Sequence, residues 1–202
     1  MNSSLSNITP LLNWYHTYAR TLPWRQSPSA YHIWVSEIML QQTRVEAVKA
    51  YYNRFTAKLP TISDLAACQE EKLLKLWEGL GYYKRVRNMQ KAAIQVMTQY
   101  HGEMPHSYEE LLKLPGIGSY TAGAVASIAY GIPVPAVDGN VLRVITRMTA
   151  NYGDITKQNT KDEITKQLQA IMPKQHAGDF NQALMELGAT VCIPNGEPQC
   201  FV

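Results

Sequence analysis

The sequence predicts an all-α fold. Apolar residues recur at helical spacing along most of the 202 residues, and hardly any stretch alternates with the period of two that a strand requires. Capping boxes, which are typical of helix starts, occur at three places: Thr61 with Asp64, Ser107 with Glu110, and Thr160 with Glu163. With 46% hydrophobic and 17% charged residues, the chain can bury a core in one unit or in two small lobes.

Taken in order, the apolar stripes predict helices over residues 4–20, 31–43, 45–58, 82–100, a segment that ends before Pro173, and about 178–191. Pro23 separates the first helix from the second, because proline cannot continue a helix. Two prolines in the segment 131–135 hold an extended connection. That segment is therefore the best candidate for a boundary between two helical lobes.

The distribution of charge favours a polyanionic partner more than the net charge of +3 does. No acidic residue lies in the range 79–102, which holds a basic run of Lys84, Arg85, Arg87 and Lys91. In the range 111–153 the only acidic residue is Asp138. Such stretches are typical of a phosphate-facing surface with isolated catalytic acids, although a solvated basic face has the same composition.

Several observations bear on the compartment. No segment approaches the roughly 18 apolar residues of a membrane span, and the N-terminus lacks the basic-then-apolar pattern of a signal peptide. Cys68, Cys192 and Cys200 are too few and too scattered for a disulfide framework, and Cys68 is expected to be a core thiol. We therefore expect a cytoplasmic, nucleoid-associated monomer with no membrane partner.

Glu37 is the only carboxylate between Met1 and Val45, and it lies in an otherwise apolar helical run. At 3.6 residues per turn its neighbours are Ile33, Trp34, Leu40 and Gln41. Such surroundings would raise the pKa of the carboxyl group and keep a proton available near neutral pH. The alternative is a glutamate at the rim of the helix with its head in water.

A second motif, Leu-Pro-Gly-Ile-Gly at residues 114–118, lies between two predicted helices. Gly116 and Gly118 permit a tight turn, and the small residues that follow allow the second helix to pack closely. The turn would direct backbone N–H groups and a helix N-terminus outward, which is a phosphate site that ignores sequence. This is the helix-hairpin-helix pattern, and a purely structural turn is its alternative.

Asp138 opens the helix that carries Arg143. It is well placed as the N-cap of that helix, which is a structural role. A capping aspartate can also direct its charge into a cleft, and the lack of other acids nearby keeps this second role open beside the structural one. The helix dipole would stabilise its charged form.

Five motifs carry a resemblance to a known family: Leu-Pro-Trp-Arg at 22–25, Ser-Glu-Ile-Met-Leu-Gln-Gln-Thr at 36–43, Gly-Leu-Gly-Tyr-Tyr at 79–83, the hairpin at 114–125 and Val-Asp-Gly-Asn-Val at 137–141. Together they resemble the helix-hairpin-helix DNA glycosylase superfamily, and within it the MutY-type adenine DNA glycosylases. The resemblance implies a two-lobed fold, with a six-helix barrel over 23–134 and a second helical lobe from 1–22 and 135–202. It also implies excision of adenine mispaired with 8-oxoguanine or guanine in double-stranded DNA.

The resemblance assigns Glu37 as the acid that protonates adenine N7 and later helps to activate water. It assigns Asp138 to the stabilisation of the oxocarbenium ion at the sugar. Tyr120 and Asn140 match residues that hold these two carboxyl groups in place. The sister family of endonuclease III type carries a lysine at the position of Tyr120 and forms a Schiff base with it. The chain therefore looks like a monofunctional glycosylase.

Further residues are assigned by the resemblance alone. Positions that line the adenine pocket are matched by Trp24, Arg25, Leu40 and Gln182. Positions that wedge into the duplex are matched by Gln42 and Tyr82. The remaining expected DNA contacts are Leu114, Gly116, Gly118 and Arg143.

The C-terminal end departs from the family. There the last helix leads to four cysteines that hold a [4Fe-4S] cluster. Here only Cys192 and Cys200 match, with seven residues between them, one more than the common spacing, and the sequence stops at Val202. We expect the cluster in a full-length chain and an incomplete site in this one. The family's C-terminal domain, which recognises 8-oxoguanine, is likewise outside these residues.

Two alternatives are open. An endonuclease III-like glycosylase would act on oxidised pyrimidines, and borohydride would trap it covalently on DNA. A non-catalytic helix-hairpin-helix module would bind DNA with a steep salt dependence and release no base.

Overall fold

Every regular element that the computed structural model describes is a helix, and the description covers residues 7–26, 28–195 and 197–200. The all-α prediction is confirmed for these residues. The chain divides into two compact units, Thr21–Tyr130 and the described parts of Met1–Arg20 and Gly131–Val202. The predicted lobe boundaries lay slightly later, after residues 22 and 134.

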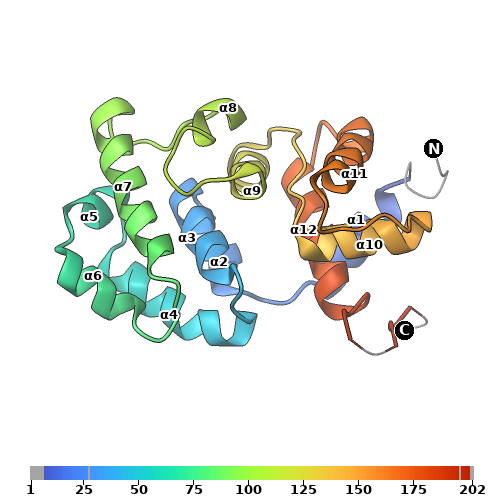
Figure 1. Ribbon diagram of the computed structural model, residues 1–202, viewed down its shortest axis with the longest axis horizontal. Helices are drawn as coiled ribbons and strands as arrows, with labels where there is room; N and C mark the ends of the chain where they lie inside the picture. Colours follow the sequence, from blue (N-terminus) through green and yellow to red (C-terminus); the bar gives the residue numbers. More distant parts are fainter. Residues whose placement is uncertain (1–6, 27, 196, 201–202) are drawn as a thin grey trace. The chain divides into compact units, whose positions relative to one another are not determined.

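The unit Thr21–Tyr130 is built around one buried helix (Figure 1). Its helices are α2 (Pro23–Gln26), α3 (Ala30–Leu40), α4 (Val45–Lys58), α5 (Ile62–Ala67), α6 (Glu70–Trp77), α7 (Lys84–Gln99), α8 (Tyr108–Leu111) and α9 (Ser119–Tyr130). Helix α3 packs against α2, α4 and α9, while α5 packs along α7. Tyr31 and all of residues 33–39 are buried, and a helix that is apolar on all sides must lie in a core.

The local signals place most helix ends correctly. Helix α4 has the predicted bounds, and the reciprocal capping box of Thr61 and Asp64 is present. Helix α3 ends at Leu40, three residues before the predicted end, because Gln42 adopts a left-handed conformation with φ +59°. Helix α7 starts two residues late for the same reason, since Tyr82 has φ +48°.

The other two capping boxes differ from the prediction. Ser107 accepts a hydrogen bond from the backbone N–H of Glu110 at 3.2 Å, but the Glu110 carboxylate binds Tyr100 and Lys113 instead of closing the box. The box at Thr160 is wrong. Helix α11 (Gln158–Ile171) already begins before Thr160, which is a buried residue inside the helix.

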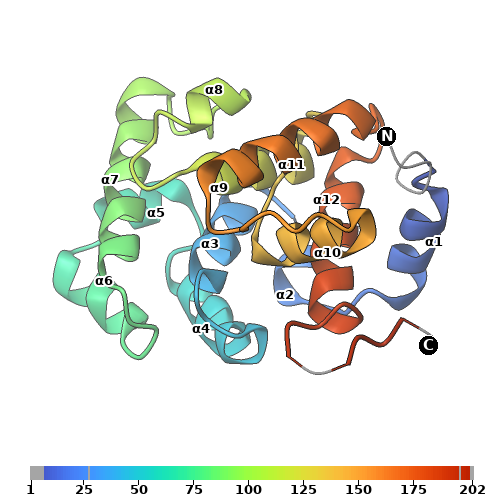
Figure 2. The ribbon, with the colours of Figure 1, turned by 45° about the vertical axis from the view of Figure 1, so that its right-hand side comes forward.

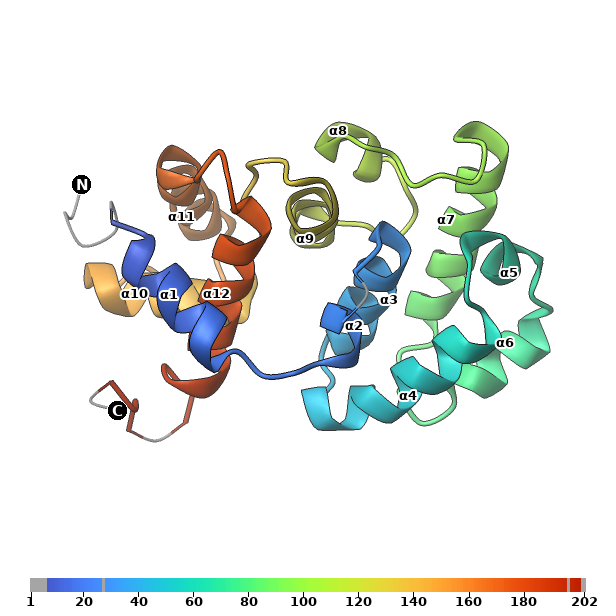
Figure 3. The same cartoon turned by 180° about the vertical axis from the view of Figure 1, so that it is seen from behind.

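The second unit consists of α1 (Thr9–Tyr18), α10 (Gly139–Thr149), α11 and α12 (Ala177–Thr190). Residues 4–6 of the predicted first helix lie outside the described residues. Figure 2 shows α10 beside α12, while α11 packs against α10, and Figure 3 shows α1 along α12 from behind. Their apolar faces form one core, which includes Val141, Leu142, Val144, Ile145, Ile164, Leu168, Phe180 and Leu184.

Two further sequence predictions can be compared with the structure. Cys68 is the C-cap of α5 and is only half-buried, with its thiol donating to the carbonyl of Gln69 at 3.5 Å. The prediction of a core thiol is therefore wrong. In the described part of the chain, the helices are all too short or too polar to cross a membrane.

Replacement of Gly116 by alanine should lower the free energy of unfolding by about 1–3 kcal/mol. The residue has φ +79°, and an added Cβ would lie 2.8 Å from the Cβ of Asn88. Gly118→Ala is the matched control, since nothing lies within 4 Å of its added Cβ. We expect it to be neutral or stabilising by up to about 1 kcal/mol. Urea denaturation measures the free energy of unfolding of both variants. Equal losses would show that the conformation of Gly116 and its contact with Asn88 do not limit the substitution.

Candidate functional site

Glu37 lies inside α3 and is buried, with only 6% of the residue exposed. The alternative of a glutamate with its head in water is therefore wrong. Tyr120, the second residue of α9, donates a hydrogen bond from its hydroxyl group to Oε2 of Glu37. The packing of α9 against α3 brings the two side chains together. A carboxyl group held out of bulk water by a neutral hydroxyl is suited to proton exchange with a bound molecule.

Three of the predicted base-pocket residues belong to the same unit as Glu37. Trp24 on α2 is buried and meets the ring of Tyr52 edge to face, with 5.4 Å between ring centroids. Arg25 and Leu40 are partly buried. The fourth, Gln182, is a partly buried residue of α12 in the other unit.

The glycine turn before α9 presents unpaired backbone donors. Within the described residues, the N–H groups of Gly116, Gly118 and Ser119 have no acceptor in the chain, and all three residues are exposed. Leu114 is buried, and its N–H and carbonyl groups bind Leu111 and Ile117. The exposed amides at the start of a helix can accept an anion such as a phosphate. Leu114 instead anchors the turn in the core.

The basic run is divided between the surface and the interior. Lys84 is exposed, and Arg87 forms an ion pair with Glu70 at 2.7 Å. Arg85 is half-buried and donates to backbone carbonyls of two other segments. Burial lowers the pKa of its guanidinium group. The run is therefore not a uniform phosphate-facing surface.

Asp138 is the N-cap of α10, as predicted. Its Oδ1 accepts a hydrogen bond from the N–H of Val141 at 2.8 Å, which satisfies a free donor of the first helical turn. Its Oδ2 accepts from the amide of Asn140 at 2.7 Å. Both oxygens are therefore oriented by α10 itself.

The surroundings of Asp138 act on its pKa in both directions. Burial is the largest effect and raises the pKa above its ordinary value. The hydrogen bonds from Val141 and Asn140 and the positive charge of Arg143 lower it. The net shift is upward, which is opposite to the effect expected from the helix dipole alone. The ionised form therefore depends on the two neighbouring donors.

Arg143 connects Asn140 to the end of α12. Its Nη2 donates to Oδ1 of Asn140 at 2.9 Å and to the carbonyl of Gly188 at 2.6 Å. Its Nε donates to the carbonyl of Cys192 at 2.8 Å. Because Arg143 occupies the amide oxygen of Asn140, the amide NH2 group faces Asp138. These internal bonds use much of the donor capacity that the sequence assigned to DNA.

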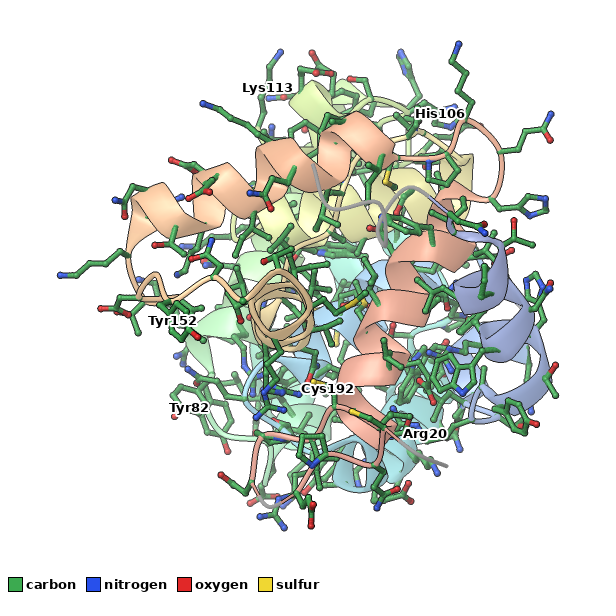
Figure 4. The ribbon with its side chains drawn as sticks, turned by 90° about the vertical axis from the view of Figure 1, so that its right-hand side faces the viewer. Arg20, Tyr82, His106, Lys113, Tyr152 and Cys192 are labelled. Atoms are coloured by element: carbon green, nitrogen blue, oxygen red, sulfur yellow. The ribbon has the colours of Figure 1, made fainter. Side chains whose placement is uncertain are left out.

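Cys192 is buried just past the end of α12 (Figure 4), and its sulfur accepts a hydrogen bond from Arg147 at 3.2 Å. Cys200 is exposed. The described residues contain no group of three or more histidine, cysteine, aspartate or glutamate side chains that could hold a metal ion. Four thiolates hold a [4Fe-4S] cluster, so these two cysteines do not form such a site by themselves.

Comparison with known proteins adds to this geometry. Residues 35–174 match a family model described as HhH-GPD superfamily base excision DNA repair protein. An adenine DNA glycosylase of Rattus norvegicus is 45% identical over 211 residues, which cover 98% of this chain and 41% of that protein. An adenine DNA glycosylase of Buchnera aphidicola is 42% identical over 195 residues, which cover 95% of this chain and 54% of that protein. The chain spans about half or less of the length of these curated relatives.

Solved structures share the fold. A thermostable thymine-DNA glycosylase superposes with a TM-score of 0.85 and 27% identity, covering 96% of this chain and 88% of that one. A trapped endonuclease III–DNA covalent intermediate superposes with a TM-score of 0.80 and 27% identity, and the match covers 96% of this chain and 87% of that one.

Substitution of Gly188 by alanine should disturb Asn140. An added Cβ would lie 2.6 Å from the Cβ of Asn140 and 3.1 Å from its backbone. We expect a loss of about 1–3 kcal/mol in the free energy of unfolding, as for other overpacked contacts. Gly139→Ala is the control next to Asp138, because nothing lies within 4 Å of its added Cβ. Thermal or urea denaturation measures the stability of both variants. If Gly188→Ala is no less stable than Gly139→Ala, the close contact with Asn140 does not limit the substitution.

Removal of the amide donor in Asn140→Ala should raise the pKa of Asp138 further, because burial would act with less opposition. On acidification, the Asp138 carboxylate would then become protonated at a higher pH in the variant than in the wild-type protein. Any property that needs the ionised form would be lost at that higher pH. Carbon-13 NMR of the carboxyl group gives the pKa directly. Asn140→Asp is unsuitable as a control because it adds a charge, so Asn140→Ser, with a hydroxyl donor, is used. An unchanged pKa in the alanine variant would contradict this account.

Proposed function

Because the chain belongs to the HhH-GPD superfamily of base excision DNA repair proteins, we propose that it forms the catalytic part of a DNA glycosylase that removes adenine. The proposed substrate is double-stranded DNA in which adenine is mispaired with 8-oxoguanine or guanine. The curated relatives named adenine DNA glycosylase support this choice of base. The buried carboxyl group of Glu37, held by the Tyr120 hydroxyl, is the observation that carries the proposal.

In the proposed reaction, the proton of the Glu37 carboxyl group moves to N7 of adenine. The bond between the base and C1′ of the sugar then breaks, and the bonding electrons leave with adenine. Water adds to C1′ of the resulting oxocarbenium ion, and its proton returns to the Glu37 carboxylate. The products are free adenine and an abasic site, and Glu37 ends in its starting state.

Asp138 serves the sugar side of this reaction. Its carboxylate places negative charge where positive charge develops, which lowers the barrier most where bulk water is excluded. Asn140 and Val141 fix the two oxygens and favour the charged form. The proposal thus gives the two carboxyl groups different protonation states, the acid at Glu37 and the anion at Asp138.

Binding to the duplex is assigned to exposed backbone and side chains of the unit Thr21–Tyr130. The free amides of Gly116, Gly118 and Ser119 would bind one phosphate group at the start of α9. The exposed residues Gln42 and Tyr82 would enter the space that the extruded base leaves.

The hairpin also favours a monofunctional enzyme. A covalent strand-nicking mechanism requires an amine that forms a Schiff base with the sugar. The hairpin carries Tyr120, whose phenolic oxygen cannot do this, and the hydroxyl group is already bound to Glu37. We therefore expect hydrolysis of the glycosidic bond without cleavage of the strand.

The activity is tested with a duplex that contains a single adenine opposite 8-oxoguanine. Under single-turnover conditions, the protein should produce abasic sites that alkali converts into strand breaks. Glu37→Gln keeps the size and hydrogen-bonding capacity of the side chain but removes the transferable proton. Its rate should fall by at least about a hundredfold, the contribution expected of a general acid. A normal rate in this variant would remove Glu37 from its role.

A second pair of substrates separates the alternatives. Borohydride trapping of a covalent adduct on a duplex with an oxidised pyrimidine would indicate an endonuclease III-like enzyme. Binding without base release from either duplex, in the natural full-length protein, would indicate a DNA-binding module. Either result would overturn the proposal.

A further inference from the structure

Two exposed residues of the unit Thr21–Tyr130 have an unusual backbone conformation. Gln42 follows α3 with φ +59°, and Tyr82 precedes α7 with φ +48°. The side chain of Tyr82 projects from the surface, and 63% of the residue is exposed (Figure 4). Left-handed backbone is unfavourable for residues other than glycine, and it persists only where the surrounding structure imposes it.

The same arginine side chain binds the backbone beside both residues. Nη1 of Arg85 donates to the carbonyl of Gln41, directly before Gln42, and to the carbonyl of Ile38 at 2.9 Å. Nη2 donates to the carbonyls of Leu80 at 3.0 Å and Gly81 at 3.4 Å, directly before Tyr82. One guanidinium group therefore joins the C-terminal end of α3 to the loop before α7.

The position of this guanidinium group is fixed from several sides. Its central carbon lies 5.4 Å from the ring centroids of both Trp77 and Tyr82. The ring of Trp77 is fully buried and donates to the carbonyl of Gly81 at 3.0 Å. Nε of Arg85 is buried and has no hydrogen-bond partner within the described residues. The guanidinium group is thus held by backbone carbonyl groups and aromatic rings of the protein itself.

We propose that Arg85 is a positioning residue that holds Gln42 and Tyr82 as one rigid pair, and that this pair drives extrusion of the substrate base from the duplex. The inference rests on the proposed function. Extrusion leaves a gap in the base stack that inserted side chains must fill, and a pre-formed pair fills it without first having to become ordered. The aromatic ring of Tyr82 and the amide of Gln42 suit stacking and hydrogen bonding to bases, respectively.

The chemistry of the contact requires arginine rather than any cation. Its planar group carries donors that point in fixed directions, which allows it to bind carbonyls of two segments together. A lysine has the same charge, but its single ammonium group cannot reproduce this bridge. Arg85→Lys therefore separates positioning from simple attraction to phosphate.

The experiment uses a duplex with the fluorescent adenine analogue 2-aminopurine opposite 8-oxoguanine, whose emission rises when the base leaves the stack. For Arg85→Lys we expect extrusion and single-turnover base release to fall together by about tenfold to a hundredfold, as for a misplaced catalytic element. Affinity for a duplex with a stable abasic analogue at that position should change much less. The pH profile of base release should keep its midpoints.

Lys84→Gln is the matched control, since Lys84 is an exposed cation next to Arg85. It should weaken binding to all duplexes alike and reduce the salt dependence, without a selective loss of extrusion. If Arg85→Lys keeps the wild-type rates of extrusion and base release, the positive charge alone is sufficient, Arg85 acts as a phosphate contact, and the proposal is wrong. A shifted pH profile would mean that Arg85 acts through Glu37, which also overturns it.

A double-mutant cycle makes the test independent of general destabilisation. In a Gln42→Ala/Tyr82→Ala background, Arg85→Lys should change the extrusion rate by less than about twofold, because the residues it positions are gone. An undiminished further loss in that background would show a merely structural effect and contradict the proposal. If the wild-type protein itself releases no adenine, the proposed function is wrong. This result differs from any in which only the Arg85 variants depart from expectation, so failure of the proposed function and failure of this proposal are distinguishable.

Discussion

The burial of α3 is the constraint on which the unit Thr21–Tyr130 depends. This helix has no face left for water along residues 33–39, so the hydroxyl and carboxyl groups on it need partners inside the protein, whereas Nε1 of Trp34 has none within the described residues. Ser36 finds its partner locally, by donating to the carbonyl of Ile33 at 2.8 Å. The longer side chain of Glu37 instead accepts a hydrogen bond from the hydroxyl group of Tyr120 on α9. The acid therefore requires a second helix, which is the one that the glycine turn starts.

A carboxylate in an apolar helix has a different outcome in the other unit. Glu186 lies in α12 with 1% of its surface exposed, but Arg20 binds it in a bidentate manner, with Nε–Oε1 at 2.6 Å and Nη2–Oε2 at 3.1 Å. An arginine partner favours the charged form and fixes the chain where it leaves α1. Glu37 accepts a hydrogen bond from the Tyr120 hydroxyl group instead. The two buried carboxyl groups thus have different described partners, a guanidinium group at Glu186 and a hydroxyl group at Glu37.

The sequence predicted features that depend on neighbours along the chain. The N-cap at Asp138, the box at Thr61 and the bounds of α4 are of this kind, since each is specified within one turn of helix. It did not reveal the contacts that side chains make with distant segments. Arg143 and Arg85 were assigned to DNA or to a basic face, but each binds carbonyl groups more than 40 residues away. Every residue has a backbone carbonyl group, so the sequence does not show which of these groups a distant arginine side chain will bind.

Most of the chemistry-bearing side chains lie where helices begin or end. Helix ends leave backbone groups without intrahelical partners, and side chains that satisfy them become oriented in return. Asp138 obtains its orientation in this way from the first turn of α10. Glu37 differs, because it lies inside α3 and accepts a hydrogen bond from Tyr120 of another helix. A change that shifts α9 therefore alters the acid without touching α3, whereas Asp138 keeps its direction as long as the first turn of α10 forms.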